Sequence, residues 1–262
     1  MSNQGGRIMK RLFLIIASLA CVLTAQAWTK VVNGASHVIA QKYMTPQALA
    51  EYKRIEGLKQ SVEYKWVAVK NAKVMLNADL QSVTTDENDI VVRIEKALDV
   101  LRNRANHSAL EQYSALMTVQ NLLPNLHNIA RIGIEGIDHS MQDFEFTWTA
   151  GKEGSKKYEK RGTLTWSRFW TNNFCFWHQG WDSEYYAYDI DLRFGKQREQ
   201  MQQGDLRSWA HEMGVMAKPL YEKWLPGCTI NNEHRLNYED IHLSNVARAG
   251  YRMAVLLNEA LK

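Results

Sequence analysis

The chain lacks a strong charge of either sign once its amino-terminal segment is set aside. Its 32 lysines and arginines outnumber its 28 acidic residues, but Arg7, Lys10 and Arg11 lie in an acid-free leader, and without these three the basic residues number 29. A chain so close to neutrality does not provide the basic surface on which general binding of nucleic acid depends. Composition therefore disfavours proteins that bind nucleic acid mainly through bulk charge.

Cysteine is scarce, and long hydrophobic runs are missing. Of three cysteines, only Cys175 and Cys228 lie beyond the leader; they could pair in an oxidising compartment, but the sequence does not decide whether they do. The apolar run from Leu12 to Leu23 is too short for a normal membrane-spanning helix. With no internal repeat, low-complexity tract or domain boundary, residues 28–262 are expected to form a single domain.

The leader has the pattern of a secretory signal peptide. Basic residues precede the apolar run, and Ala25-Gln-Ala27 is an A-x-A cleavage site. We expect residues 1–27 to be removed, so that Trp28 becomes the first residue of an exported protein, periplasmic or secreted. Lipoprotein processing at Cys21 is the alternative, and Ser18 three residues upstream makes it the weaker one.

Hydrophobic residues make up 45% of the chain, which is enough for a core, and most of the remaining pattern is helical. Helix-start signals and apolar periodicity predict helices from Trp28 to Tyr43, from Pro46, over about 57–80, over about 90–104, from Leu206 to about Ala217, and from about Tyr238 to Leu261. Alternation at Phe144, Phe146 and Trp148 and again at Leu164 and Trp166 predicts one β-hairpin. The fold class expected is all-α, with several helices and one small hairpin.

The most distinctive stretch lies at the end of a long central helix. Ser108 and Glu111 form a capping box that starts this helix. Asn121 and Asn125 follow near its end, four residues apart and therefore on one face. Pro124 lies between them and should kink or end the helix.

This stretch resembles the central motif of the zinc-dependent, single-strand-preferring nucleases (the nuclease S-one/P-one family), which share an all-helical fold with bacterial phospholipase C. The family motif reads roughly L-I-H-x-x-G-D-x-H-Q-P-L-H. Aligned without gaps, its first His falls on Asn121, its Asp on Asn125, the His of H-Q-P on His127 and its last His on Arg131.

Further short segments of the mature chain resemble motifs of the family. Phe176-Trp-His-Gln-Gly-Trp-Asp-Ser183 is similar to the family's N-L-H-x-V-W-D-S, so that His178 and Asp182 match a ligand His and Asp. Gln202-Gln-Gly-Asp205 with Ser208-Trp-Ala210, and Ala249-Gly-Tyr-Arg-Met-Ala-Val-Leu-Leu-Asn-Glu259, also match family words. An H-x-x-x-D pair at helical spacing can present both side chains to one ion.

The resemblance implies a three-zinc site, but most of its ligands are replaced in this chain. Trp28 matches the amino-terminal Trp whose backbone binds zinc. Of eight side-chain ligands only His178 and Asp182 match; the others fall on Asn33, Ala68, Asn121, Asn125 and Arg131, and one has no candidate because no histidine lies between His37 and His107. Amide oxygens are weak zinc donors, and two side chains do not complete a zinc site.

Arg131 is the most informative change, because it puts a permanent cation where the family has a zinc ligand. We expect its guanidinium to replace zinc and to pair with Asp182 near His178, with Asn121 and Asn125 on the opposite wall. His37 is expected to lie on a helix surface, although it could also turn toward the site.

The sequence therefore predicts an exported, monomeric protein of the nuclease family that has lost catalysis. Its pocket would hold a nucleotide, a single-stranded nucleic acid or another phosphate-bearing ligand. No cofactor is expected, and zinc would bind at His178 and Asp182 only if the family site is partly retained. One alternative is a working phosphodiesterase with a metal site rebuilt from His127, Asp138 or His139. Another is a structural or interaction protein of the cell envelope.

Overall fold

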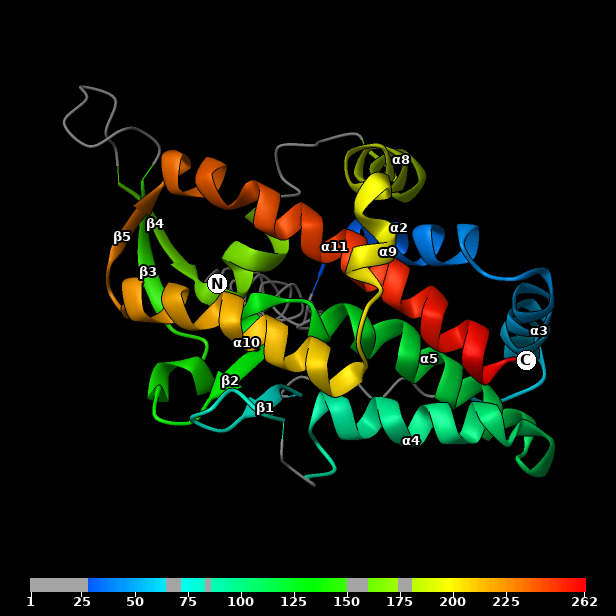
Figure 1. The fold of residues 1–262 in the computed structure, drawn as a ribbon. Helices are drawn as coiled ribbons and strands as arrows, with labels where there is room; N and C mark the ends of the chain where they lie inside the picture. Colours follow the sequence, from blue (N-terminus) through cyan, green and yellow to red (C-terminus); the bar gives the residue numbers. More distant parts are fainter. Residues whose placement is uncertain (1–27, 65–71, 83–85, 150–159, 174–180) are drawn as a thin grey trace, which may run out of the picture.

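A computed structural model describes residues 28–64, 72–82, 86–149, 160–173 and 181–262, and most of these are helical (Figure 1). The helices are α2 Lys30–Lys42, α3 Pro46–Gly57, α4 Ile90–Arg102, α5 Ala109–Leu126, α6 Trp166–Arg168, α8 Ser183–Phe194, α9 Arg198–Met201, α10 Leu206–Lys223 and α11 Asn232–Ala260. Within these ranges, no helix is both long enough and apolar enough to cross a bilayer.

Four helices begin where the sequence predicted their starts. The Thr45 side chain accepts a hydrogen bond from the Ala48 amide, with Pro46 at the first helical position. Ser108 and Glu111 form the predicted capping box of α5. Asp89 caps α4 and Asp205 caps α10. The predicted starts of these helices are confirmed because each cap is a side chain only two or three residues from the amides that it satisfies.

The expected fold class, all-α with one hairpin, is wrong, because the described residues include five strands in two small sheets. The hairpin of β3 Glu145–Thr149 and β4 Lys160–Thr165 exists, but β5 Thr229–Asn231 adds to β3 in parallel. A second sheet pairs β1 Val74–Leu76 in parallel with β2 Ile132–Ile134. The fold is therefore mostly α with some β.

Two further expectations need correction. The segment expected to be helical over about 57–80 contains only the 3₁₀ turn η1 Leu58–Gln60 and strand β1 in its described part, with residues 65–71 outside it. The last helix begins at Asn232 rather than near Tyr238, because the Asn231 side chain caps it by accepting from the Glu233 and His234 amides.

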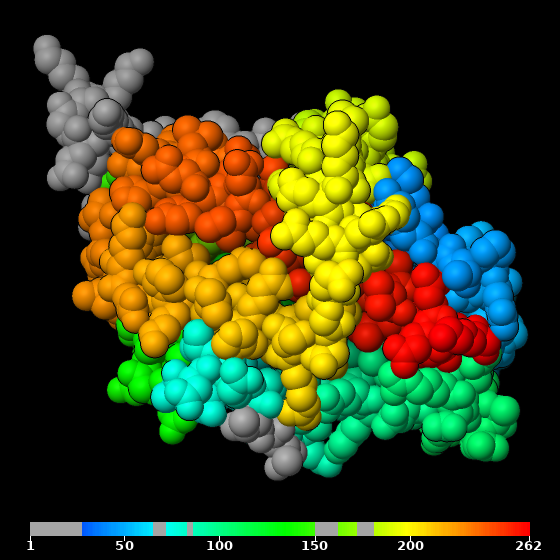
Figure 2. Space-filling view, in the orientation of Figure 1, coloured from blue at the N-terminus to red at the C-terminus, as the bar shows by residue number. Residues whose placement is uncertain are grey.

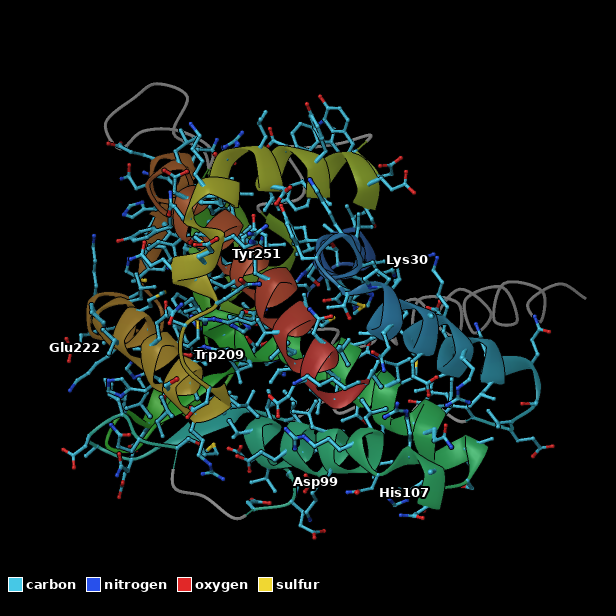
Figure 3. The ribbon with its side chains drawn as sticks, turned by 45° about the vertical axis from the view of Figure 1, so that its right-hand side comes forward. Lys30, Asp99, His107, Trp209, Glu222 and Tyr251 are labelled. Atoms are coloured by element: carbon cyan, nitrogen blue, oxygen red, sulfur yellow. The ribbon has the colours of Figure 1, made fainter. Side chains whose placement is uncertain are left out.

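Helix α11 runs diagonally through the molecule, with α8 and α2 on one side and α10 on the other (Figure 1). The larger hydrophobic cluster joins α3, α4, α5, α10 and both sheets, and a second cluster joins α2, α8 and α11 around Trp28. Trp209 and Tyr251 lie inside the bundle, whereas Asp99 and His107 lie at its edge (Figure 3). In the space-filling view the yellow segment around α9 runs down the front of the molecule over α11 (Figure 2).

Candidate functional site

Arg131 is held at the junction between the central helix and the small parallel sheet. Helix α5 ends at Leu126, and the 3₁₀ turn η3, Ile129–Arg131, leads directly into β2. The Asn128 side chain accepts from the Ala130 amide at 2.9 Å, and the Arg131 amide donates to the Asn128 carbonyl at 2.8 Å. The Arg131 side chain is only 7% exposed. The turn therefore fixes a buried guanidinium beside β1 and β2.

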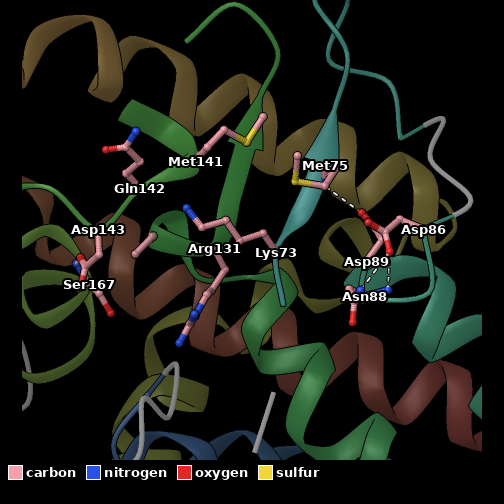
Figure 4. Close-up of a pocket in the computed structure, with 11 residues that line it drawn as sticks. Lys73, Met75, Asp86, Asn88, Asp89, Arg131, Met141, Gln142, Asp143 and Ser167 are labelled. Atoms are coloured by element: carbon pink, nitrogen blue, oxygen red, sulfur yellow. Dashed lines mark hydrogen bonds between the residues drawn. The ribbon is translucent and has the colours of Figure 1, made fainter. Parts of the chain in front are cut away.

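A cavity of about 520 Å³ opens beside this arginine (Figure 4). Its walls come from the residues around β1, from η3, from the end of η4 Asp138–Met141, and from α6. The residues that line it are Lys73, Met75, Asp86, Asn88, Asp89, Ala130, Arg131, Met141, Gln142, Asp143 and Ser167. This volume is in the range of small-ligand sites.

Lys73 supplies a second basic group to the cavity. Its Nζ donates to the Ser140 carbonyl at 2.7 Å. Burial and the nearby positive charge of Arg131 lower the pKa of Lys73 to about 8, although the Asp143 carboxylate opposes this change. Burial also lowers the pKa of Arg131. The charged forms of both side chains are thus partly desolvated, which favours an anion beside them.

The carboxylates that line the cavity are engaged with backbone amides. Asp89 accepts from the Val91 amide at 2.7 Å and from the Met75 amide at 2.8 Å. Asp86 accepts from the Asn88 amide at 2.8 Å, and Asp143 from the Ser167 amide at 2.7 Å. These hydrogen bonds hold the three carboxylates against the backbone that forms the cavity wall.

Two thioethers form an apolar part of the wall. A Cβ atom added at Gly133 of β2 would lie 2.6 Å from the Met141 sulfur and 3.0 Å from the Met75 sulfur. The glycine therefore leaves the space that both methionines fill. Thioether side chains adapt readily to the shape of what they contact.

The structure does not join Arg131 to Asp182 in the predicted ion pair. Asp182 is exposed, and its carboxylate caps α8 by accepting from the Tyr185 amide at 2.8 Å. Its backbone is extended, so Asp182 precedes the helix rather than lying within a helical H-x-x-x-D turn. Among the described residues, those that line the cavity of Arg131 do not include Asp182. The predicted pair is not formed, since Asp182 lies exposed at the start of α8 whereas Arg131 is buried.

The two asparagines of the central motif turn toward their own helix. Asn121 Nδ2 donates to the Met117 carbonyl, and Asn125 Nδ2 to the Asn121 carbonyl, both at 2.7 Å. Neither lines the cavity described here. The Oδ1 atoms of Asn125 and Asn33 are buried and accept no hydrogen bond from described residues. An unsatisfied buried acceptor costs stability.

His127 is a structural residue. It is completely buried, its Nδ1 lies 2.9 Å from the Leu123 carbonyl, and its Nε2 lies 3.0 Å from Arg252 Nη1. Because the guanidinium can only donate, Nε2 accepts and the ring proton resides on Nδ1. Burial, followed by the charge of Arg252, holds the pKa of His127 well below its usual value. Both nitrogens are therefore occupied.

The remaining predicted positions are dispersed. Trp28 is buried with its ring edge against His242, and its carbonyl accepts from Asn33 Nδ2 at 3.4 Å. His37 does not lie free on a surface, since its Nε2 lies 2.8 Å from the Gln120 carbonyl and links α2 to α5. Ala68, Cys175 and His178 lie outside the described residues.

The rebuilt metal site is not assembled in the described part of the chain. His139 Nε2 lies 2.9 Å from the Tyr221 carbonyl, whereas Asp138 is exposed and His127 is bound to Arg252. No group of three or more His, Cys, Asp or Glu side chains among these residues could hold a metal ion. Lys73, Asp143 and the two methionines were not predicted, and no motif in the sequence indicates them.

Neither a comparison with protein-family models nor one with curated proteins finds a match for this chain.

Proposed function

We propose that this chain is an exported protein of the zinc-nuclease type that binds a phosphate-bearing ligand without hydrolysing it. The observation that carries the proposal is the cavity in which Arg131 and Lys73 both lie. Guanidinium and ammonium groups are the protein's usual partners for phosphate, and partial burial strengthens their attraction for an anion. Export itself rests on the leader sequence.

The contacts of the residues that match the family's zinc ligands favour binding of a phosphate over its hydrolysis. Asn121 and Asn125 direct their amide nitrogens at helix carbonyls, and Asp182 is used as a cap. Phosphodiester hydrolysis by the family needs metal ions that activate water and stabilise the leaving oxygen. At Arg131 a fixed positive charge occupies the position matched to a zinc ligand, and a cation there repels a metal while it attracts a phosphate.

Calorimetric titration with inorganic phosphate and with a nucleoside monophosphate tests this proposal. Arg131→Gln should weaken binding about tenfold or more, as expected for the loss of a hydrogen bond to a charged group. Lys73→Gln should weaken it too, whereas Lys30→Gln, at an exposed position of α2, should leave it unchanged. Thermal melting of each variant separates lost binding from lost folding.

A parallel assay separates binding from catalysis. Purified without chelator, the protein should contain far fewer than three zinc ions per chain and should cleave single-stranded DNA no faster than buffer. Cleavage that depends on zinc and disappears with chelator would replace this proposal with the phosphodiesterase alternative. Unchanged phosphate affinity in both the Arg131 and Lys73 variants would remove the cavity as the binding site.

A further inference from the structure

Lys73 is partly buried in a cavity, unlike the exposed lysines of the described chain. Its amine donates to the Ser140 carbonyl, its pKa is affected by the charge of Arg131, and both residues line a cavity large enough for a small molecule. Its side chain extends across the cavity, with its nitrogen on the side where Met141 and Gln142 lie (Figure 4). A lysine that is both desolvated and next to another cation is the arrangement that activates an amine as a nucleophile.

We propose that Lys73 is a nucleophilic lysine that captures a small carbonyl compound as a Schiff base, with Arg131 binding the carboxylate or phosphate of that compound. The neutral Lys73 Nζ attacks the carbonyl carbon and forms the C–N bond. The amine gives up two protons, the carbonyl oxygen leaves with them as water, and a C=N bond remains. The step needs no oxidant, reductant or metal.

The charges around Lys73 favour the neutral amine that this reaction requires. Arg131 from η3 opposes protonation, whereas Asp143, after η4, favours it. Asp86 and Asp89, before α4, also line the cavity, but backbone amides bind their carboxylates. With burial as the largest cause, the pKa of Lys73 is lowered to about 8, so about half of the amine is neutral at pH 8.

The nucleophilic amine stands independently of the proposed function, whereas the role of Arg131 rests on it. Two carbonyl probes separate these parts: glyoxylate, which carries a carboxylate, and acetaldehyde, which is neutral. Each is incubated with the full-length protein and cyanoborohydride, which reduces the imine, and the modified lysines are identified by peptide mass spectrometry. Lys96, whose side chain is 60% exposed, is the internal reference.

We expect glyoxylate to modify Lys73 at least about tenfold faster than Lys96 at pH 8, because burial and Arg131 favour the neutral, nucleophilic form of the Lys73 amine. The rate at Lys73 should rise with pH through a midpoint near 8, a profile that a merely structural lysine would not show. Lys73→Arg should keep phosphate binding and lose trapping. Arg131→Lys, which keeps the charge, should trap glyoxylate better than Arg131→Gln.

Two outcomes overturn parts of this inference separately. If neither probe modifies Lys73 faster than Lys96, Lys73 is not a nucleophile, whatever phosphate titration shows. If both probes modify it rapidly but Arg131→Gln leaves the glyoxylate-to-acetaldehyde rate ratio unchanged, the amine is reactive and Arg131 does not bind the anion of the carbonyl compound; the phosphate titrations decide the proposed function separately.

Discussion

Several residues that the sequence analysis singled out have structural roles in the described part of the chain. His127 is the clearest, since its two ring nitrogens join the end of α5 to Arg252 of α11. Arg131 was predicted from sequence to be a pocket residue, and it does line a cavity. Its expected partner Asp182 instead caps α8, because a resemblance in sequence does not show which capping bond a carboxylate makes.

The buried neutral state of His127 makes stability depend on pH. Its folded pKa lies well below 6.5, so below pH 6.5 the unfolded chain binds a proton that the folded chain does not. The stability that this gives is therefore complete above pH 6.5 and is lost as the pH falls, at about 1.4 kcal/mol per pH unit at most. Denaturant unfolding at pH 7.5 and 5.5 measures it. His127→Gln should show a smaller fall over this range; an equal fall in both proteins would contradict the assignment.

Among the elements, local signals predicted where several helices begin, but they did not predict the short strands. The capping box of Ser108 and Glu111 acts within four residues, so the sequence alone shows where α5 begins. Strands β1, β2 and β5 have three residues each, too few for alternation to be recognised. Each exists because a distant segment pairs with it, and Lys73 acquires its surroundings from that same pairing. Its role could not be predicted from nearby residues.

Gly133 of β2 leaves room for the Met141 and Met75 side chains, which line the cavity of Lys73 and Arg131. In Gly133→Ala the new Cβ would displace the sulfurs of Met141 and Met75. Because methionine is flexible, we expect a loss in the free energy of unfolding of about 1–3 kcal/mol and a weaker affinity for phosphate as the thioethers shift. Gly57→Ala has open space around its Cβ and should not destabilise the protein. If Gly133→Ala leaves the affinity for phosphate unchanged, these methionines do not contact the bound ligand.

At the scale of the whole molecule, α8 is attached to the rest mainly through the second hydrophobic cluster and one acid. Asp191 accepts from Lys42 Nζ at 2.6 Å, from Tyr43 Oη at 2.9 Å and from Tyr251 Oη at 2.7 Å. These contacts bring α2, α8 and α11 together on a side of α11 away from α10 (Figure 1). The helix can therefore loosen while the larger cluster stays intact.

Asp191→Asn tests this attachment. It weakens three charge-assisted hydrogen bonds, so we expect a loss of about 1–3 kcal/mol and faster hydrogen exchange in α8 than in α4 and α5. Asp189→Asn, two residues away, removes only a pair with the partly exposed Arg193 and should change stability by less than about 1 kcal/mol. Uniform acceleration of exchange throughout the protein would instead show that α8 unfolds with the whole domain.

The parallel pairing of β1 with β2 also determines when, during folding, the Lys73 amine becomes shielded from water. Val74 pairs with Ile132 across the whole of α4 and α5, so this contact requires the closure of a long loop. The helices on that loop can form from local interactions before the loop closes. Lys73, one residue before β1, is shielded only when the two strands meet. The reactive amine is then a late product of folding, and a chain caught before strand pairing would carry an ordinary lysine at this position.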